Sequence, residues 1–353
     1  MQDLNTIVSD PNIETLFDPV TAERKFRIDP TVIISEPPAV LYMINEDGKE
    51  IPTFTRGSFS TIIGKAKSKK TYFTVFLIAS FMGYANNRTR GNPHGKPTVL
   101  WFDTEQSPYH LTKMVQRCCR LIGESNPVNL KVYMLRTCTT DERVKLIDYT
   151  IRENPSASLV IIDGIRDLVY DINSPEEATT TATRLMKWSV ENDIHILNVL
   201  HQNKGDANAR GHLGTELTNK AESIISIEVS DDPAISTVTA EYTRDVEFKS
   251  FSFTINADSL PVLCDTPIRE GTKELNPNLI PDEVHFEKLG KVYAKLEELP
   301  TYNELIDKII YAFDNAFGES KCRRFISHYT GNGWVSKIRN GHKVGYKYER
   351  AIF

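Results

Sequence analysis

The sequence predicts an α/β fold with a mostly parallel sheet, followed by a smaller C-terminal module. Between positions 59 and 200, continuous apolar runs of strand length alternate with longer helical patterns. Strands that are apolar on both sides are typical of a parallel sheet covered by helices on both faces. A stretch rich in Pro, Asn, Thr and charge, 258–284, then interrupts this pattern, and a chain of 353 residues is long enough for two domains.

The elements of the core follow one another in a regular order. The expected strands are 60–64, 98–102, 131–135, 159–162 and 194–200, and the expected helices are 71–86, 108–122, 140–153 and 175–192. Ser107 and Ser174 are of a type that caps helix N-termini, and each precedes a proline at the first helical position. Closely spaced strand-like runs follow at 223–229, 236–242 and 251–255. They predict an antiparallel extension of the same sheet, so the core domain spans 59–257.

Both ends of the chain differ from this core. Residues 1–58 combine prolines with short apolar runs, and we expect an N-terminal extension that packs on the core. Within it, the turn residues 45–49 separate two strand-like segments, which favours a hairpin. After the linker 258–284, the module 285–353 has helical patterns and then a hairpin, the order of a winged helix-turn-helix. Its expected helices are 286–298, 302–317 and 320–329, and its hairpin lies in 334–348.

A lysine-rich segment joins the first core strand to its apolar helix. It matches the phosphate-loop pattern G-x-x-x-x-G-K-[S/T] at Gly64, Lys70 and Thr71, but Lys69 stands at the second glycine position. In such loops, backbone amides and the lysine bind the phosphates of ATP, and the threonine hydroxyl binds Mg²⁺. The expected nucleotide-binding residues are Gly64, Lys65, Ala66, Lys67, Ser68, Lys69, Lys70, Thr71 and Tyr72. The alternative is a solvated lysine-rich turn.

Acidic residues end two of the predicted strands. Asp163 follows a Leu/Val/Ile run, where a carboxylate can join Thr71 in holding Mg²⁺. Otherwise Asp163 caps the following turn. Glu105 follows the strand 98–102 and can accept a proton from a water that attacks the γ-phosphate. The alternative for Glu105 is an ordinary polar strand end.

Further polar residues follow the strand 194–200. His201 and Gln202 can contact the γ-phosphate, although a lone histidine at a strand end also has structural uses. Arg210 and Arg244 are candidate arginine fingers for the site of a neighbouring subunit, or else they are solvated.

The segment from about residue 58 to 257 resembles the RecA superfamily of P-loop ATPases, in particular the RepA-like hexameric helicases and related AAA-family ATPases of plasmids and mobile elements. The resemblance rests on Gly64 with Lys70-Thr71, on Asp103-Thr104-Glu105-Gln106, on the strand that ends in Asp163, and on His201. It implies catalysis by Glu105, Mg²⁺ at Asp163, and a homo-oligomer with sites between subunits. It also implies that the loop 202–213 faces DNA, although this loop is only mildly basic.

The C-terminal module is locally basic in a chain whose net charge is −5. Basic residues crowd into 320–350 and aromatic residues lie among them, which favours contact with single- or double-stranded DNA. The basic residues are Lys321, Arg323, Arg324, Lys337, Arg339, Lys343, Lys347 and Arg350, and the aromatic ones are Tyr329, Trp334, Tyr346 and Tyr348. The alternatives are that the aromatic side chains form a core and that the module binds protein.

The remaining composition fits a cytoplasmic protein that does not enter a membrane. The N-terminus has no basic stretch followed by an apolar run, the apolar run 74–84 is short, and the five cysteines show no C-x-x-C spacing. The leading hypothesis is an ATP-driven DNA motor or loader that acts in replication or transfer of a mobile element. A nucleotide-gated DNA-binding regulator with little or no hydrolysis is the second. A P-loop kinase is the third, and the lack of an arginine-rich lid segment disfavours it.

Overall fold

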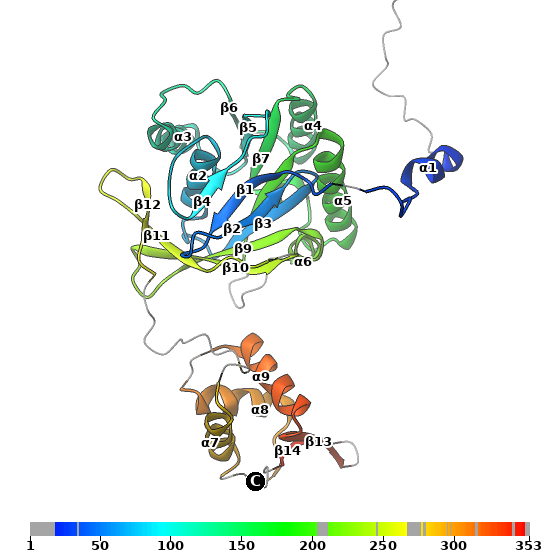
Figure 1. The fold of residues 1–353 in the computed structure, drawn as a ribbon, viewed down its shortest axis with the longest axis vertical. Coiled ribbons are helices and arrows are strands. Elements are labelled where there is room, and N and C mark those ends of the chain that lie inside the picture. The colour runs from blue at the N-terminus through cyan, green and yellow to red at the C-terminus, as the bar shows by residue number, and fades with distance from the viewer. Residues whose placement is uncertain are drawn as a thin grey trace, which may run out of the picture. The chain divides into compact units, whose positions relative to one another are not determined.

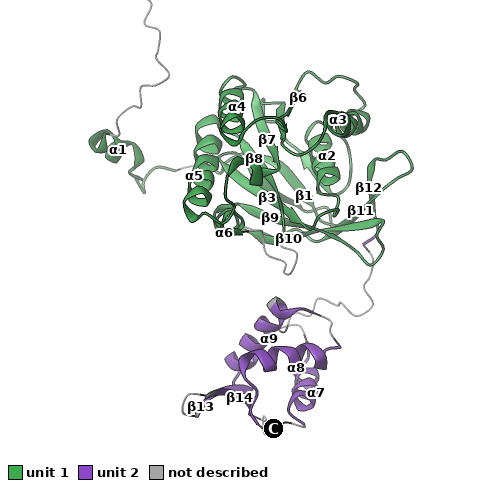
Figure 2. Ribbon diagram, turned by 180° about the vertical axis from the view of Figure 1, so that it is seen from behind, with its two compact units in different colours: residues 1–264 green, residues 265–353 purple. Residues whose placement is uncertain are grey.

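The structure is a computed structural model that describes residues 18–33, 35–202, 211–244, 246–266, 277, 280–294, 296, 298–314, 317–340 and 343–349. The chain divides into two compact units, Met1–Cys264 and Asp265–Phe353 (Figure 2). Each unit has its own hydrophobic core, and each is described by itself.

A nine-stranded sheet forms the centre of the first unit, with the strand order β12-β11-β10-β9-β3-β8-β7-β5-β6. Its strands are β3 (Ser58–Gly64), β5 (Thr98–Asp103), β6 (Leu130–Met134), β7 (Ala157–Asp163), β8 (His195–His201), β9 (Ser223–Val229), β10 (Ile235–Thr243), β11 (Phe251–Ile255) and β12 (Pro261–Cys264). The six strands from β6 to β9 in this order pair in parallel, and β9 to β12 pair antiparallel. The predicted α/β fold, its mostly parallel sheet and the antiparallel extension are confirmed.

Helices cover both faces of this sheet (Figure 1). They are α2 (Lys70–Phe81), α3 (Pro108–Ile122), α4 (Thr140–Arg152), α5 (Pro175–Asn192) and α6 (Gly211–Lys220). Alternate residues of each strand enter two separate cores. In β7, Leu159 and Ile161 join the core that contains α2 and α3, whereas Val160 and Ile162 join the core that contains α4, α5 and α6. This alternation explains why the strands read as continuous apolar runs.

The N-terminal region adds a small sheet of β1 (Ala39–Ile44), β2 (Glu50–Thr55) and β4 (Thr89–Gly91). The predicted hairpin is confirmed, because β1 and β2 pair antiparallel around the turn 45–49. Apolar residues of both strands, among them Leu41 and Phe54, enter the same core as α2. Helix α1 (Pro19–Phe26) precedes this sheet and has no buried residue.

Several elements of the first unit, among them α1, β4, α6 and β12, were not expected from the sequence. Helix α2 ends at Phe81, earlier than expected, and the strand β4 begins after Asn86, whose side chain accepts hydrogen bonds from the amides of Arg88 and Thr89. Helix α6 occupies 211–220. Strand β12 pairs with β11 and lies inside the range that we assigned to the linker, so the first unit extends to Cys264.

The second unit contains three helices followed by a hairpin, in the predicted order. Its elements are α7 (Asp282–Tyr293), α8 (Tyr302–Ala312), α9 (Glu319–Gly331), β13 (Val335–Asn340) and β14 (Lys343–Tyr348). Tyr329 and Tyr346 are buried in its core, and Trp334 and Tyr348 pack against that core. The aromatic residues are therefore packing residues and not exposed stacking platforms. None of the helices in the described residues is long and apolar enough to cross a membrane.

Candidate functional site

The predicted site residues converge where β3, β5, β7 and β8 end. Parallel strands place their carboxyl ends at one edge of a sheet, and here they surround a cavity of about 250 Å³. The cavity is lined by Lys67, Ser68, Lys69, Lys70, Thr71, Tyr72, Glu105, Gln106, Met114, Asp163, Gly164, Val199, Leu200 and His201. The N-terminus of α2 opens into it, so the site combines a helix dipole with acidic and basic side chains.

The loop between β3 and α2 contains two residues with left-handed backbone conformations. Lys67 has φ = 67°, and Lys69, the N-cap of α2, has φ = 68° and ψ = 27°. Each left-handed side-chain-bearing residue costs about 1–2 kcal/mol, so the backbone is strained at both positions. Turns that place left-handed residues among right-handed ones direct successive amide groups into an anion-binding concavity.

The position of Gly64 has no room for a side chain. A Cβ atom added there would lie 2.5 Å from the carbonyl oxygen of Ile227 and 2.6 Å from Ser68 Oγ. The first glycine of the phosphate-loop pattern is therefore explained by its close approach to β9. Gly64, Lys65 and Ala66 form the backbone turn and do not line the cavity wall.

Lys70 is buried, and its ammonium group is fully engaged. Its Nζ donates to the carbonyl oxygens of Gly64 (2.9 Å) and Lys65 (3.0 Å) and lies 3.1 Å from His201 Nδ1. Burial lowers the pKa of Lys70 to about 8, and the nearby carboxylates of Asp163 and Glu105 oppose this shift. The charge is held at the cavity by two carbonyl groups of the segment 64–71 and by His201 at the end of β8.

Asp163 is the acid most deeply placed in the site. Within the described part of the chain, its buried Oδ2 atom has no hydrogen-bond partner. Burial, with Asp103 and Glu105 close by, raises the pKa of Asp163 to about 7, while Thr71 and Lys70 act in the opposite direction. A buried oxygen without a partner beside a threonine hydroxyl suits a hard cation that keeps its other ligands from water and phosphate, as Mg²⁺ does. No cluster of three or more His, Cys, Asp or Glu in the described residues forms a metal cage.

Glu105 lies opposite Lys70, and His201 stands between them. Glu105 Oε1 is 3.6 Å from His201 Nε2, and this interaction is the main reason why the pKa of Glu105 is lowered. Because the Lys70 ammonium donates to Nδ1 of His201, we place the imidazole proton on Nε2, facing Glu105. The three side chains form one polar chain across the cavity.

Residues that the sequence reasoning did not single out hold Glu105 in place. Asp103 accepts hydrogen bonds from the amides of Glu105 (3.1 Å) and Gln106 (2.7 Å). The Thr104 hydroxyl donates to Asp167 at 2.8 Å. Asp103 and Thr104 therefore behave as a structured strand end, while Glu105 itself lines the cavity. The signal for this role was present in the sequence as an acid two residues before Glu105, the spacing of an Asx turn.

Gly164 allows the strand ends to approach closely. Its φ is +108°, and an added Cβ would lie 2.0 Å from Thr104 Oγ1. The oxygen of that hydroxyl also lies 3.2 Å from the carbonyl oxygens of Asp163 and Gly164. The ends of β5 and β7 are thus joined beneath the two acids of the site.

The other predicted residues are placed less centrally. Gln202 is buried and its backbone N–H donates to Gly64 O at 3.2 Å. The ring of Tyr72 lies 5.0 Å beneath the guanidinium group of Arg117. Arg244 follows β10 at the opposite edge of the sheet and donates to Lys220 O, so it is not part of this site.

The predicted DNA-facing loop 202–213 is only partly described. Residues 203–210, including Arg210, lie outside the described residues. Residues 211–213 are not loop, because they begin α6 and Leu213 is completely buried. That end of the predicted loop is corrected: its apolar side chain packs in the core and does not face a channel.

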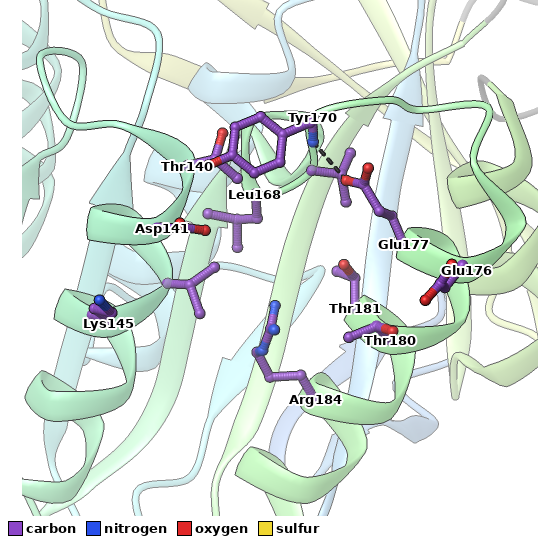
Figure 3. A pocket seen from close by; sticks show the side chains of 12 residues that line it. Thr140, Asp141, Lys145, Leu168, Tyr170, Glu176, Glu177, Thr180, Thr181 and Arg184 are labelled. Carbon is purple, nitrogen blue, oxygen red and sulfur yellow. Dashed lines mark hydrogen bonds between the residues drawn. The ribbon is translucent and has the colours of Figure 1, made fainter. Parts of the chain in front are cut away.

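A second cavity, of about 590 Å³, lies between α4, the 3₁₀ helix η1 (Ile165–Leu168) and α5 (Figure 3). Arg184 reaches into it from α5, and burial lowers the pKa of its guanidinium. Glu177 accepts a hydrogen bond from the Tyr170 amide at its rim. This cavity is larger, but it contains none of the predicted site residues and no phosphate-binding loop. The smaller cavity is therefore the candidate functional site.

Comparisons with known proteins give one similar solved structure and one matching family model. The crystal structure of the RadB recombinase is similar to the chain with a TM-score of 0.42 and 15% sequence identity, over 58% of this chain and 90% of that one. No curated protein matches the sequence. A family model described as an AAA domain matches residues 31–207, which is half of the chain. This range includes every residue that lines the cavity. The chain belongs to the AAA-domain family.

Proposed function

We propose that this protein binds ATP with Mg²⁺ in the cavity at the N-terminus of α2 and hydrolyses it, as part of a DNA-associated homo-oligomer. One observation carries the proposal: Lys70, Asp163 and Glu105 meet around one small cavity beside a loop with two left-handed residues. An ammonium, a carboxylate with one oxygen left unpaired among the described residues, and an ionised base are the groups that ATP hydrolysis uses.

The chain's own residues account for binding. The phosphates of the nucleotide replace Gly64 O, Lys65 O and His201 as acceptors for the Lys70 ammonium. Amide groups of the loop and of the first turn of α2 supply further donors. Thr71 and Asp163 would hold Mg²⁺, which would supply positive charge to the phosphate oxygens. The lowered pKa of Lys70 matters little once the anion is bound, because a neighbouring negative charge favours the protonated amine.

Glu105 is the proposed catalytic base. The pKa of its carboxyl is lowered, so it is ionised at neutral pH and able to accept a proton from the attacking water. His201 orients Glu105 through Nε2 and, with Gln202, reports whether a γ-phosphate is present. When Lys70 turns to the phosphates, His201 loses its partner at Nδ1, which links occupancy of the site to the position of Glu105. Arg244 and Arg210 remain proposed fingers for the site of a second copy.

The second unit supports the proposed contact with DNA. Lys321, Arg323 and Arg324 are exposed on α9, and Lys337, Arg339 and Lys347 are exposed on the hairpin. The acids Glu319 and Glu349 in the same segment pair with Arg323 and Lys347. Because the aromatic residues are packed in the core, we expect binding through phosphates, with strong dependence on salt. The proposed role is that of a helicase-like motor or loader in replication or mobilisation of a mobile element.

A nucleotide-gated DNA-binding regulator is the alternative function. It is favoured by Lys69, which puts a side chain on the loop where the phosphate-loop pattern has glycine. Such a protein binds ATP in the same cavity but turns it over little or not at all.

Phosphate release and nucleotide binding, measured on wild type and Glu105→Gln with and without single-stranded DNA, test the proposal. General-base catalysis contributes about 10²–10⁴-fold, so Glu105→Gln is expected to lose at least a hundredfold in rate while it still binds ATP. Glu176→Gln on α5 is the matched control and should hydrolyse ATP as wild type does. Binding without release by wild type would favour the regulator, and absence of DNA retention at low salt would remove the proposed DNA role.

A further inference from the structure

Lys69 does not direct its charge at the cavity. Its Nζ donates to the carbonyl oxygens of Pro233 (2.8 Å) and Ala234 (3.1 Å) and to the hydroxyl of Ser236 (3.1 Å). An ammonium has three N–H donors, so these three oxygens satisfy all of them. Pro233 and Ala234 belong to the turn between β9 and β10 and Ser236 is the second residue of β10, all far from Lys69 in the sequence.

This turn is itself well ordered by hydrogen bonds. Ser230 N donates to Ile235 O, and Ala234 N donates to Asp232 Oδ1 at 2.9 Å. The hydroxyl of Thr254, on β11, donates to Ala234 O at 3.0 Å. Lys69 is thus bonded to a turn that joins β9 to β10 and is itself hydrogen-bonded to β11.

A second link runs beside the first. Ser236 Oγ, which accepts from Lys69, donates to the carbonyl oxygen of Ser68 at 3.3 Å. Ser68 and Ser236 are both buried. Burial also lowers the pKa of Lys69, against the attraction of Asp232, which is the behaviour of a partly enclosed ammonium and not of a solvated one. The turn therefore holds both the side chain and the backbone of the loop.

We infer that Lys69 is a positioning residue whose ammonium ties the phosphate loop to the β9–β10 turn and keeps residue 69 left-handed, the conformation that glycine adopts without a tether. The inference rests on the proposed function, since it concerns the loop that binds the phosphates. It explains why a lysine is tolerated at this position: side-chain hydrogen bonds offset the backbone strain. It also separates Lys69 from Lys70, whose ammonium faces the cavity.

The variants Lys69→Met and Lys69→Gly separate a tether from a phosphate ligand. Methionine keeps the strain and removes the tether, so affinity for Mg²⁺–ATP is expected to fall by about tenfold, the effect of losing one set of charged hydrogen bonds. Glycine removes the tether and the strain together and should bind more tightly than methionine. A phosphate ligand would instead be lost equally in both. Lys67→Met is the matched control, because Lys67 is also left-handed but exposed, and it measures the loss of one positive charge beside the site.

Ser236→Ala provides a test from the other side of the contact. It should weaken nucleotide binding in the wild-type background and have little further effect in Lys69→Met, which is the coupling expected of two groups in one tether. Independent, additive losses from the two substitutions would overturn the inference.

Hydrogen exchange of the backbone amides 65–70 tests the tether without nucleotide. Faster exchange is expected in Lys69→Met than in Lys67→Met. If the wild-type protein bound no nucleotide but the exchange difference were found, the proposed function would fail and the tether would stand. If nucleotide bound and all variants matched the Lys67→Met control in both affinity and exchange, the tether would be refuted.

Discussion

The most informative residue of the site is Asp163, since it combines deep burial with an oxygen that has no partner among the described residues. Its raised pKa means that the folded protein favours the protonated acid. Such a group contributes its full stability below the pKa of the unfolded state, and that contribution is lost as pH rises through the folded value of about 7. The fold therefore carries a destabilising charge at the pH where its ligand binds, as functional sites often do.

Asp163→Asn is expected to stabilise the nucleotide-free protein at pH 8 and to leave it little changed at pH 4.5. The gain at pH 8 should be on the order of 4 kcal/mol, because the pKa rises from 3.8 to about 7 and each pKa unit corresponds to about 1.4 kcal/mol. Urea unfolding at several pH values measures it. Asp171→Asn, at an exposed position on the loop before α5, is the control. A constant difference between Asp163→Asn and wild type across the pH range would contradict the assigned burial.

The raised pKa of Asp163 predicts that binding of Mg²⁺–ATP releases protons. Mg²⁺–ATP brings a cation to Asp163 and favours its ionised form, so at pH 6.5 binding should release a large fraction of one proton. Calorimetry in two buffers with different ionisation enthalpies measures the number. Asp163→Asn should abolish most of the release, and an unchanged release in that variant would place the titrating group elsewhere.

At the scale of elements, long periodic segments could be predicted well. Helices α3 and α5 and strands β9 and β11 have the bounds that the sequence indicated. The misses are short or depend on distant partners. β4 and β12 have three and four residues and exist because β1 and β11 pair with them.

The residues of the site fall into the same two groups as the elements: those with a local sequence signal, and those whose role depends on distant partners. Gly64, Lys70, Thr71, Glu105 and Asp163 could be found because each follows a strand or opens a helix, and the parallel sheet then brings them together. The contacts of Lys69 with the β9–β10 turn could not be found, since no local pattern records a hydrogen bond to a residue more than 160 positions away.

Two glycines test the packing of individual elements. Gly290 lies within α7, and no atom from beyond its own stretch of helix lies within 4 Å of the position that a Cβ would take. Gly290→Ala should therefore raise the stability of the second unit by up to about 1 kcal/mol.

Gly91 is different, because an added Cβ would lie 2.3 Å from the Cα of Phe81. Gly91→Ala should destabilise the first unit by roughly 2 kcal/mol. Thermal unfolding of both variants checks the two signs, and a loss of stability in Gly290→Ala would mean that α7 is packed differently.

At the scale of the whole molecule, the two functions proposed for the protein lie in different compact units. All residues of the candidate nucleotide site lie in Met1–Cys264, whereas the exposed basic residues of α9 and the hairpin lie in Asp265–Phe353. The cores of the two units share no residue. Each unit therefore has the means to fold by itself.

The fragment 1–264 is expected to bind Mg²⁺–ATP with the affinity of the full chain and to lose retention of DNA at low salt. The fragment 265–353 should unfold cooperatively and retain DNA, with the affinity falling steeply as salt increases. Filter binding and calorimetry measure both properties. DNA retention by 1–264 equal to that of the full chain would move the proposed DNA contact to the first unit.

The central claim is that the cavity at the N-terminus of α2 holds the phosphates of ATP. A crystal structure with Mg²⁺ and a non-hydrolysable ATP analogue tests it most directly. The account predicts β- and γ-phosphates against the amides of Lys69–Thr71, with the Lys70 ammonium moved from His201 to the phosphates and Lys69 still bound to the β9–β10 turn. Nucleotide found only in the cavity between α4 and α5, or a Lys70 ammonium that remains on Gly64 and Lys65 beside a bound nucleotide, would contradict it.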